Sequence, residues 1–558
     1  MKLKGLGKRL YNITFHTHTV TGIVISAALF VIFYAGAFSL FREEIYKWEN
    51  PSARHVYIEH DMNIDDLVAT IQRDIPDVEL TAITTIRGPH EAMPYWQFYG
   101  AEMHQDEGEE EPHSHRFAAY INSDLAEPVI KQDEPKTTVG STLYRLHYFG
   151  QIPAGIHISG LVALFFLFAT ITGVLIHWRN MIDKLYAFTI KGSWKNIWAN
   201  AHTVLGLLGL PFQIMYAITG ALFGILIILL IPAAFILFGG DTAAVTAAVA
   251  PEAAIVTSKD SPEVEELASI ETLVAETRER YPDYPISRIR LNNYGREDAL
   301  ALMYLDDEAT LNGNGVVTYR IQTGEILAET SPIDKNYTES VYNLLTRLHF
   351  ATYGGIVLKV VYFILALITC FMFISGVLLW QAARDKKTYT DKQRRFHHKV
   401  TKVNLAFCLS MFPAFALIFI LNKVIPMELV GRVGAVNGAF FLGWLIMTLI
   451  GLRWNNYRRL NKNYLVMGAV LSLLVPIVNG VVTGDWFWST LINGQVYVAA
   501  VDLFWLFASL TAFAIVNKIK RKEKINVVEA KEVMDKPQQA EKVAEPIVLG
   551  ISNRAKLE

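Results

Sequence analysis

Uncharged apolar runs alternate along the chain with two long stretches of mixed polarity. Each mixed stretch contains an amphipathic helical pattern (65–73 and 270–280) followed by β-rich runs. The pattern predicts an α-helical polytopic membrane protein, with about eight transmembrane helices and two small α+β domains outside the membrane. Runs long enough to cross a hydrocarbon core of about 30 Å lie near 19–41, 155–178, 203–238, 356–381, 403–421, 435–452, 464–482 and 498–517.

The first four spans carry an internal duplication, in which each unit is a helix, an outer domain and a second helix. The opening helices share a His-x-x-x-Gly step, the outer domains end in an Arg-Leu-His-aromatic step, and the closing helices contain Gly-Val-Leu. The matched positions are His18 with His202, Gly22 with Gly206, His147 with His349, Gly150 with Gly354 and Gly173 with Gly376.

Basic residues cluster on one side of the predicted spans. They lie before the first span, between the second and third, and after the fourth, sixth and eighth, which places both termini in the cytoplasm and the two long domains outside. The expected parts are the N-terminus with the first helix (1–41), outer domain one (42–150), helices two and three (151–238), outer domain two (239–348), the fourth helix with a cytoplasmic loop (349–402), four C-terminal helices (403–517) and a disordered cytoplasmic tail (518–558).

Composition narrows the class of protein further. The chain is 52% hydrophobic with a formal net charge of −2, so a nucleic-acid-binding protein is excluded and membrane lipid is the expected surrounding. Its two cysteines, Cys370 and Cys408, both fall inside predicted spans, and no Cys-x-x-Cys-His motif is present to attach a haem covalently. Any haem must therefore be held by coordination and packing.

Histidines at the ends of the first helices point to such a haem. Ionisable side chains beside a bilayer are costly enough to suggest function, and neutral imidazole is a usual axial ligand of haem b. The topology sorts these histidines into an inner layer and an outer layer, so we expect two haems, with a third left open. The inner layer is His16, His18, His177, His202, His397 and His398, and the outer layer is His147, His157 and His349.

The duplication predicts how these histidines pair. A pseudo-two-fold axis normal to the membrane would bring His147 to His349 outside and His18 to His202 inside, with the neighbouring matched glycines leaving room for a flat macrocycle. His177 has Trp380 at its repeat position, yet its layer would also allow pairing with His398 or His202. His157 has no histidine equivalent and could replace a ligand, contact a haem propionate or serve a third haem. The alternative is that all of them hydrogen-bond at the head-group boundary.

The repeated unit resembles the PepSY-associated transmembrane family, iron-regulated membrane proteins that include ferrisiderophore reductases. The stretches 172–192 and 201–213 carry the resemblance best, and it covers roughly residues 10 to 400. It implies two periplasmic PepSY-like domains on a haem-bearing four-helix core in a bacterial inner membrane, passing electrons to a periplasmic ferric siderophore or other ferric complex. The family's histidine positions fall on His18, His202, His147, His349 and His177.

Two weaker signals lie outside the repeated steps. The segment 104–115 carries His104, His113 and His115 among carboxylates, which could hold iron briefly or could simply form a solvated hairpin loop. Asp485 and Asp502 flank or enter the last span, where a buried carboxylate could relay protons or touch a quinol.

No nucleotide-binding motif appears in the sequence, so the expected electron donor is a quinol, a soluble flavoprotein or free reduced flavin. Outer-sphere electron transfer needs no catalytic residue beyond the haem ligands. The competing interpretations are a membrane-anchored PepSY protein that binds or regulates peptidases, and a transporter for iron or its chelate.

Overall fold

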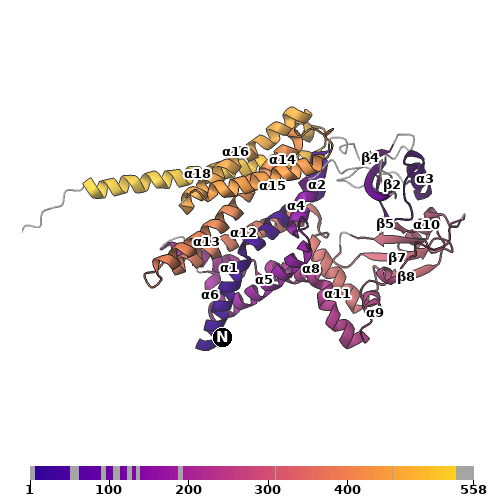
Figure 1. Ribbon diagram of the computed structural model, residues 1–558, viewed down its shortest axis with the longest axis horizontal. Helices are drawn as coiled ribbons and strands as arrows, with labels where there is room; N and C mark the ends of the chain where they lie inside the picture. Colours follow the sequence, from indigo (N-terminus) through magenta and orange to yellow (C-terminus); the bar gives the residue numbers. More distant parts are fainter. Residues whose placement is uncertain are drawn as a thin grey trace, which may run out of the picture.

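A helical bundle and a β-sheet lie side by side in this computed structural model (Figure 1). The structure describes residues 7–50, 62–88, 96–104, 113–121, 129–132, 139–186, 193–264, 266–307, 310–454 and 456–535. The N-terminus and the far end of the last helix lie at the end of the bundle opposite the sheet (Figure 1).

The bundle is that of a multi-pass membrane protein. Seven helical segments are long and apolar enough to cross a membrane among the described residues, or up to eight if one bent pair is a single span. The helices of the bundle are α1 (Lys8–Ser39), α5 (Gly155–His177), α7 (Trp194–Leu208), α8 (Leu210–Phe238), α12 (Gly355–Arg384), α13 (Asp391–Leu409), α14 (Met411–Val424), α15 (Arg432–Gly451), α16 (Tyr457–Thr483) and α18 (Val496–Asp535).

Two expected segments have features that the apolar runs do not show. The third span is bent, because α7 and α8 meet at an angle of 70° around Gly209. Pro211 lies in the first turn of α8, where a backbone N–H has no partner within the helix, so proline is tolerated at this restart. The tail expected from 518 begins as a continuation of α18, which is helical through Asp535.

Short helices link the longer elements. Those between the bundle and the sheet are α2 (Arg42–Glu49), α4 (Val139–His147), α9 (Thr242–Val249) and α11 (Tyr337–Phe350), while α6 (Met181–Leu185) lies between α5 and α7 and α17 (Phe487–Ile492) lies between α16 and α18. Between α4 and α5 the chain passes through left-handed conformations at Phe149 and Ala154, and between α11 and α12 it does so at Ala351 and Gly354. The Arg-Leu-His step therefore ends a separate short helix before each long one, because a left-handed residue stops a helix.

One eight-stranded antiparallel sheet lies at the end of the bundle opposite the N-terminus, the end expected to be the outer one, and its strand order is β4-β3-β2-β1-β5-β6-β7-β8 (Figure 1). The two predicted outer domains contribute four strands each and join where β1 pairs with β5, for example Thr85 with Arg290. The strands are β1 (Thr84–Arg87), β2 (Trp96–His104), β3 (His113–Ile121), β4 (Ile130–Gln132), β5 (Ile286–Asn292), β6 (Leu300–Leu305), β7 (Gly315–Arg320) and β8 (Ile326–Thr330).

The helices α3 (Ile64–Asp74) and α10 (Ile270–Arg280) cap each other across this join. The Asp65 carboxylate accepts the backbone N–H groups of Ile270 and Glu271, while Glu271 accepts the N–H of Ile64. Carboxylates at helix N-termini satisfy N–H groups that lack partners within the helix. Both helices pack on the apolar face of the sheet, in a core that includes Phe98 and Leu291.

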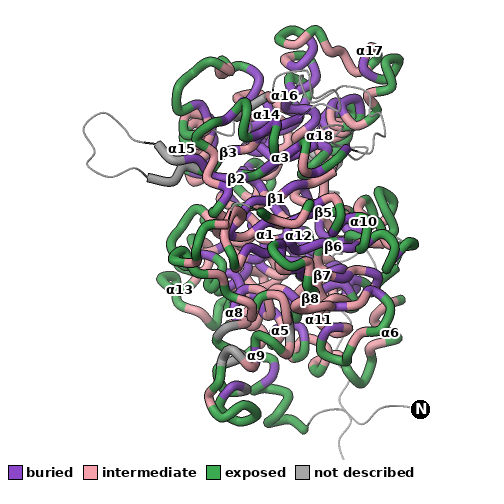
Figure 2. The backbone as a smooth tube through the Cα atoms, turned by 90° about the vertical axis from the view of Figure 1, so that its right-hand side faces the viewer, coloured by how far each residue is buried: buried purple, intermediate pink, exposed green. Residues whose placement is uncertain are grey.

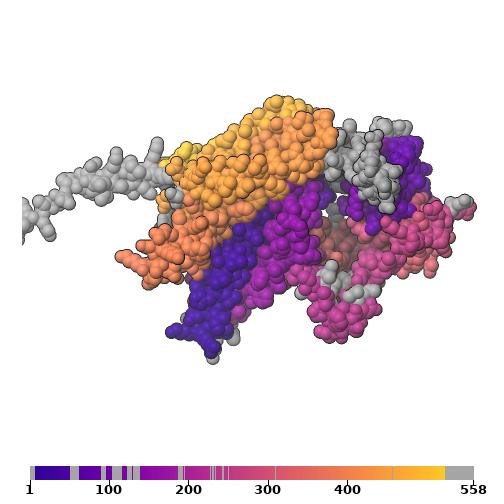
Figure 3. Space-filling view, in the orientation of Figure 1, coloured from indigo at the N-terminus to yellow at the C-terminus, as the bar shows by residue number. Residues whose placement is uncertain are grey.

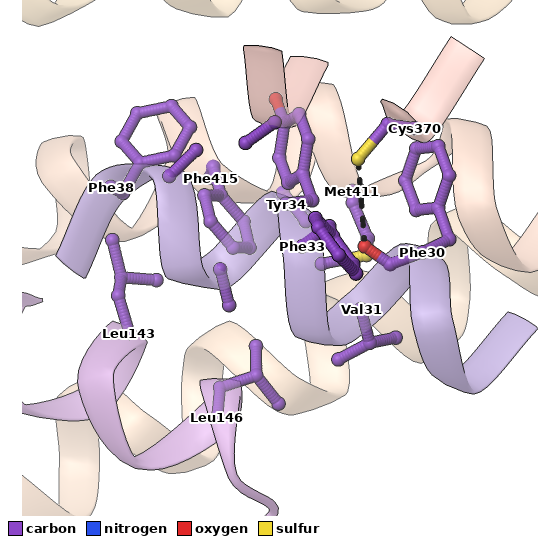
Figure 4. Close-up of a cluster of buried hydrophobic side chains, with 14 of the residues drawn as sticks. Phe30, Val31, Phe33, Tyr34, Phe38, Leu143, Leu146, Cys370, Met411 and Phe415 are labelled. Atoms are coloured by element: carbon purple, nitrogen blue, oxygen red, sulfur yellow. Dashed lines mark hydrogen bonds between the residues drawn. The ribbon is translucent and has the colours of Figure 1, made fainter. Parts of the chain in front are cut away.

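The helix α1 lies in the centre of the bundle and packs on α4, α5 and α12. Its outer half is buried on several sides, whereas the ends of many other helices are exposed (Figure 2). Figure 4 shows Phe33, Tyr34 and Phe38 of α1 among Phe415 of α14 and Leu143 of α4. The C-terminal helices therefore share one apolar core with the first span.

Candidate functional site

Two histidine pairs lie inside the bundle, one near each end. The rings of His18 and His202 are 6.0 Å apart between centroids, and those of His147 and His349 are 5.9 Å apart. The first pair lies on α1 and α7 toward the N-terminal end, and the second lies at the ends of α4 and α11 toward the sheet. These are the pairs that the duplicated sequence predicts to meet.

The inner pair is positioned by the Gly-Val-Leu segments. The Nδ1–H of His18 donates to the carbonyl oxygen of Ala169 at 2.8 Å, and its ring packs on Gly173 one turn later. In the same way, His202 donates to Met372 at 3.0 Å and packs on Gly376. A side chain at either glycine would collide with the imidazole, which explains why glycine stands at both positions.

The residue before each of these glycines binds the same carbonyl. The hydroxyl of Thr172 donates to the Ala169 oxygen at 3.0 Å, and that of Ser375 donates to the Met372 oxygen at 2.7 Å. The Ser/Thr-Gly pair in the two closing helices therefore has a physical role. It orients one carbonyl and leaves space for the imidazole that binds it.

The outer pair is anchored differently on its two sides. His147 donates its Nδ1–H to the carbonyl oxygen of Ile32 at 2.7 Å, and His349 donates to the Thr219 hydroxyl oxygen at 2.8 Å. That hydroxyl gives its own proton to the Met215 carbonyl, so it can only accept from the imidazole. The glycine that makes room is Gly36 of α1, where a Cβ would lie 2.6 Å from Nδ1 of His147.

All four imidazoles share one consequence of these contacts. A carbonyl or an already donating hydroxyl accepts only, so each Nδ1 carries the hydrogen and each Nε2 keeps its lone pair. This tautomer is the one that a histidine uses when Nε2 binds a metal and Nδ1 is held by a second group. The chemistry of the four side chains therefore fits axial ligation of iron.

The outer pair is also held in the neutral form. Burial lowers the pKa of His147, and burial together with His147 lowers the pKa of His349 to about 3. Neutral imidazole is required for metal binding, because a protonated ring has no free lone pair. Both rings are therefore neutral at physiological pH.

An aromatic cluster fills the space between the two pairs. It consists of Phe33, Phe166, Phe212, Tyr216 and Phe373, with ring centroids 4.6 to 6.3 Å apart. Tyr216 reaches the outer pair, with its ring 5.1 Å from that of His349. Along α1, His18 and Ile32 are 14 residues apart, or about 21 Å at 1.5 Å per residue.

The other predicted histidines belong to neither pair, and only His177 lies close to one of them. His157 donates to the Gly224 carbonyl at 2.7 Å, where α5 and α8 cross closely. His398 stacks on Tyr457, and its Nδ1 hydrogen-bonds the Tyr457 hydroxyl at 2.6 Å. His397 packs on Trp380, and His16 is exposed. His177 ends α5 close enough to His18 and His202 to interact with both electrostatically.

The acidic hairpin is only partly described. Backbone pairing joins His104 of β2 to His113 of β3, and Glu102 to His115, while residues 105–112 lie outside the described residues. In the part of the chain that the structure describes, no group of three or more His, Cys, Asp or Glu residues is arranged to hold a metal ion.

A cavity of about 1610 Å³ extends from the outer pair to the sheet. Its inner wall includes His147, His349 and Gly36, and a hollow is visible between bundle and sheet (Figure 3). The sheet face opposite carries polar and aromatic side chains among aliphatic ones, unlike the apolar face under α3 and α10. Its polar and aromatic side chains include Arg87, Gln97, Tyr99, Tyr120, Arg288 and Tyr304.

The contact between Gly36 and His147 gives a first testable prediction. Gly36→Ala should displace the His147 imidazole from the Ile32 carbonyl, because the new methyl group would overlap Nδ1. Metal-site variants in the supporting shell typically lose about 10- to 100-fold in affinity. Retention of added haem during gel filtration would measure the loss of haem affinity. Gly438→Ala is the control, because that helical glycine has open space around it. Equal retention in both variants would contradict the prediction.

Several residues of the site carry no sequence signal. The Ile32 and Met372 carbonyls are backbone groups, so any side chain could stand there, and Thr219 looks like one more polar residue in an apolar helix. The Ser/Thr-Gly repeat in 172–173 and 375–376 was the one available signal for the carbonyl contacts.

Comparison with known proteins gives one match. A family described as the PepSY-associated TM region matches residues 15–383, about two thirds of the chain. No curated protein matches the sequence.

Proposed function

The chain belongs to the PepSY-associated transmembrane family, and from this premise we propose that it is a haem b oxidoreductase of a bacterial inner membrane. It passes electrons from the cytoplasmic side to a ferric complex, such as a ferric siderophore, outside. The haems supply one-electron chemistry at potentials that axial ligands and surroundings set.

The spacing of the two histidine pairs is the observation that carries this proposal. An imidazole nitrogen binds a first-row metal at about 2.0 Å and lies roughly 1 Å from its ring centre, so two axial imidazoles need centres about 6 Å apart. The measured separations of 5.9 and 6.0 Å fit this requirement. In the inner pair, the helical glycines Gly22 and Gly206 face open space, which would admit a macrocycle.

The outer glycines do not have the expected role. A Cβ at Gly150 would meet the Tyr148 ring, and Gly354 adopts a left-handed conformation before α12. Space at the outer pair comes instead from Gly36 and the large cavity.

The proposed internal duplication is supported by matching contacts. Ala169 and Met372 stand four residues before Gly173 and Gly376, and each binds the histidine of its own unit. The N-termini of α3 and α10 cap each other through equivalent positions, with Asp65 binding Ile270 and Glu271 binding Ile64. A pseudo-two-fold arrangement accounts for both observations, and the two PepSY-like domains would then share the eight-stranded sheet.

The direction of electron flow follows from the proposed orientation. His18 and His202 would face a cytoplasmic donor, which is a quinol, a flavoprotein or reduced flavin. The aromatic cluster around Phe33 excludes water between the pairs. The cavity would admit the ferric complex on the outer side, where Tyr and Arg side chains of the sheet can hold oxygen-rich anionic ligands.

The test begins with the purified full-length protein. It should bind about two haems per chain and give a low-spin bis-imidazole spectrum that sharpens on reduction. In proteoliposomes, an enclosed reductant should reduce an external ferric siderophore. Colourless protein after expression with excess haem would reject the proposal and favour the peptidase-regulating anchor, and chelate uptake without reduction would favour the transporter.

A further inference from the structure

We infer that Glu49 takes up one proton when the haem proposed at His147 and His349 accepts one electron. This inference rests on the proposed function and adds a group that neither the histidine pattern nor the family assigns. Glu49 ends α2, is 3% exposed, and lines the same cavity as His147.

The surroundings of Glu49 place it at the start of the helix that carries His147. Its Oε1 accepts the backbone N–H of Gly140 at 3.1 Å, in the first turn of α4. From Gly140 to His147 the helix spans seven residues, or about 10 Å. Two unit charges about 10 Å apart in a protein interior interact strongly enough to change an equilibrium constant by about tenfold. The protonation of Glu49 and the reduction of an iron held by His147 would each be shifted by about this factor.

Two nearby cations hold the backbone around Glu49. Lys423 of α14 donates to the Trp48 carbonyl at 2.7 Å and to the carbonyl of Glu49 itself at 3.4 Å, and it lies over the Trp48 ring. Arg432 of α15 donates to the carbonyls of Ile425 and Asn422. The charges of both cations also act on the Glu49 carboxylate. Other charged or titratable groups on the elements around it include Arg42, Glu43, Glu44, Tyr46, Lys47, Tyr120, Tyr144, Lys359, Glu428 and Asp502.

A buried carboxylate is poised near neutrality when its burial outweighs the groups that favour its charge. Burial raises the pKa of Glu49 to about 7, and the backbone N–H groups of Gly140 and Val139 and the charges of Lys423 and Arg432 oppose this only in part. Below pH 7 the group already holds its proton before an electron arrives. Above pH 7 it is ionised in the oxidised protein, so the added negative charge of reduction can draw a proton onto it.

The balance of the step is one electron and one proton. With a haem held by His147 and His349, one electron arriving there from the inner site would be matched by one proton that the Glu49 carboxylate takes from bulk solvent through the cavity, so the net charge of the region would stay constant. When the electron passes to the ferric complex, which becomes ferrous, Glu49 releases the proton to the cavity. The oxygen donors of a ferric chelate accept protons as the ferrous ion leaves, so the released proton has an acceptor there.

The experiment is a spectroelectrochemical titration of the outer haem in the full-length protein at several pH values. At a fixed applied potential, the ferrous to ferric ratio should be constant below pH 7 and fall about tenfold in total as pH rises to about 8.5. Glu49→Gln, which keeps the acceptor for Gly140 but cannot ionise, should abolish the fall. Glu44→Gln is the matched control, because Glu44 is also buried in α2, lines the cavity and pairs with Lys359.

The outcomes separate the two proposals. A ratio independent of pH in the wild type, or an unchanged fall in Glu49→Gln, overturns the inference while the haems remain. Absence of haem overturns the proposed function itself and this inference with it. If Glu49→Gln fails to fold, redox-induced infrared difference spectra of the wild type decide, because a protonated carboxyl band must appear on reduction.

Discussion

Replacing His147 with alanine should roughly halve the bound haem, from about two per chain to about one, and abolish reduction of an external ferric complex. The substitution removes an Nε2 ligand and leaves His349 with no second imidazole within reach in the contacts described. The remaining haem should keep its bis-imidazole spectrum, because the inner pair is about 21 Å away along α1. Pyridine haemochrome assays and absorption spectra measure both results.

His157→Ala is the matched control for that variant. His157 also belongs to the predicted outer layer, but its Nδ1 binds the Gly224 carbonyl at 2.7 Å, where α5 and α8 cross, whereas His147 and His349 face each other. Its haem content should stay near the wild-type value. If His157→Ala loses a haem and His147→Ala does not, the outer ligands have been assigned to the wrong residues.

Replacing His202 with alanine should remove the inner haem and disconnect the outer haem from the cytoplasmic donor. In proteoliposomes, an enclosed donor should then leave the outer haem oxidised, whereas external dithionite should still reduce it. The pair of readouts distinguishes a broken path from an unfolded protein. Stopped-flow absorption records both reductions.

His398→Ala serves as the control for the inner layer. This side chain stacks on Tyr457 and bonds its hydroxyl, so its loss should leave electron transfer from inside intact. A wild-type rate in His202→Ala would mean that His177, which lies close to the inner pair, supplies the ligand instead.

The repeated steps in the sequence predicted which histidines meet. Because His18 and His202, and His147 and His349, occupy matched positions, one pseudo-two-fold relation was enough to bring each pair together. The family resemblance and the multi-pass helical class are confirmed. The role of these histidines as haem ligands stays a prediction, as do the cofactor and the reaction.

Features that depend on three-dimensional contacts could not be predicted. Hydropathy treats 203–238 as one apolar run, since Gly209 and Pro211 both occur in membrane helices and only packing decides whether a bend forms. Strand patterning located most strands but gave no register between distant segments, so the pairing of β1 with β5 was not foreseen. Burial of Glu49 arises from helices about 370 residues later in the chain.

The central position of α1 has a consequence for biogenesis. This helix is synthesised more than 300 residues before α12 and α14, which cover it. During translation its aromatic side chains must therefore face lipid or the insertion machinery, and they exchange those neighbours for protein only when the last helices arrive. A chain truncated after the fourth span would leave the side of α1 that α14 covers permanently in contact with lipid.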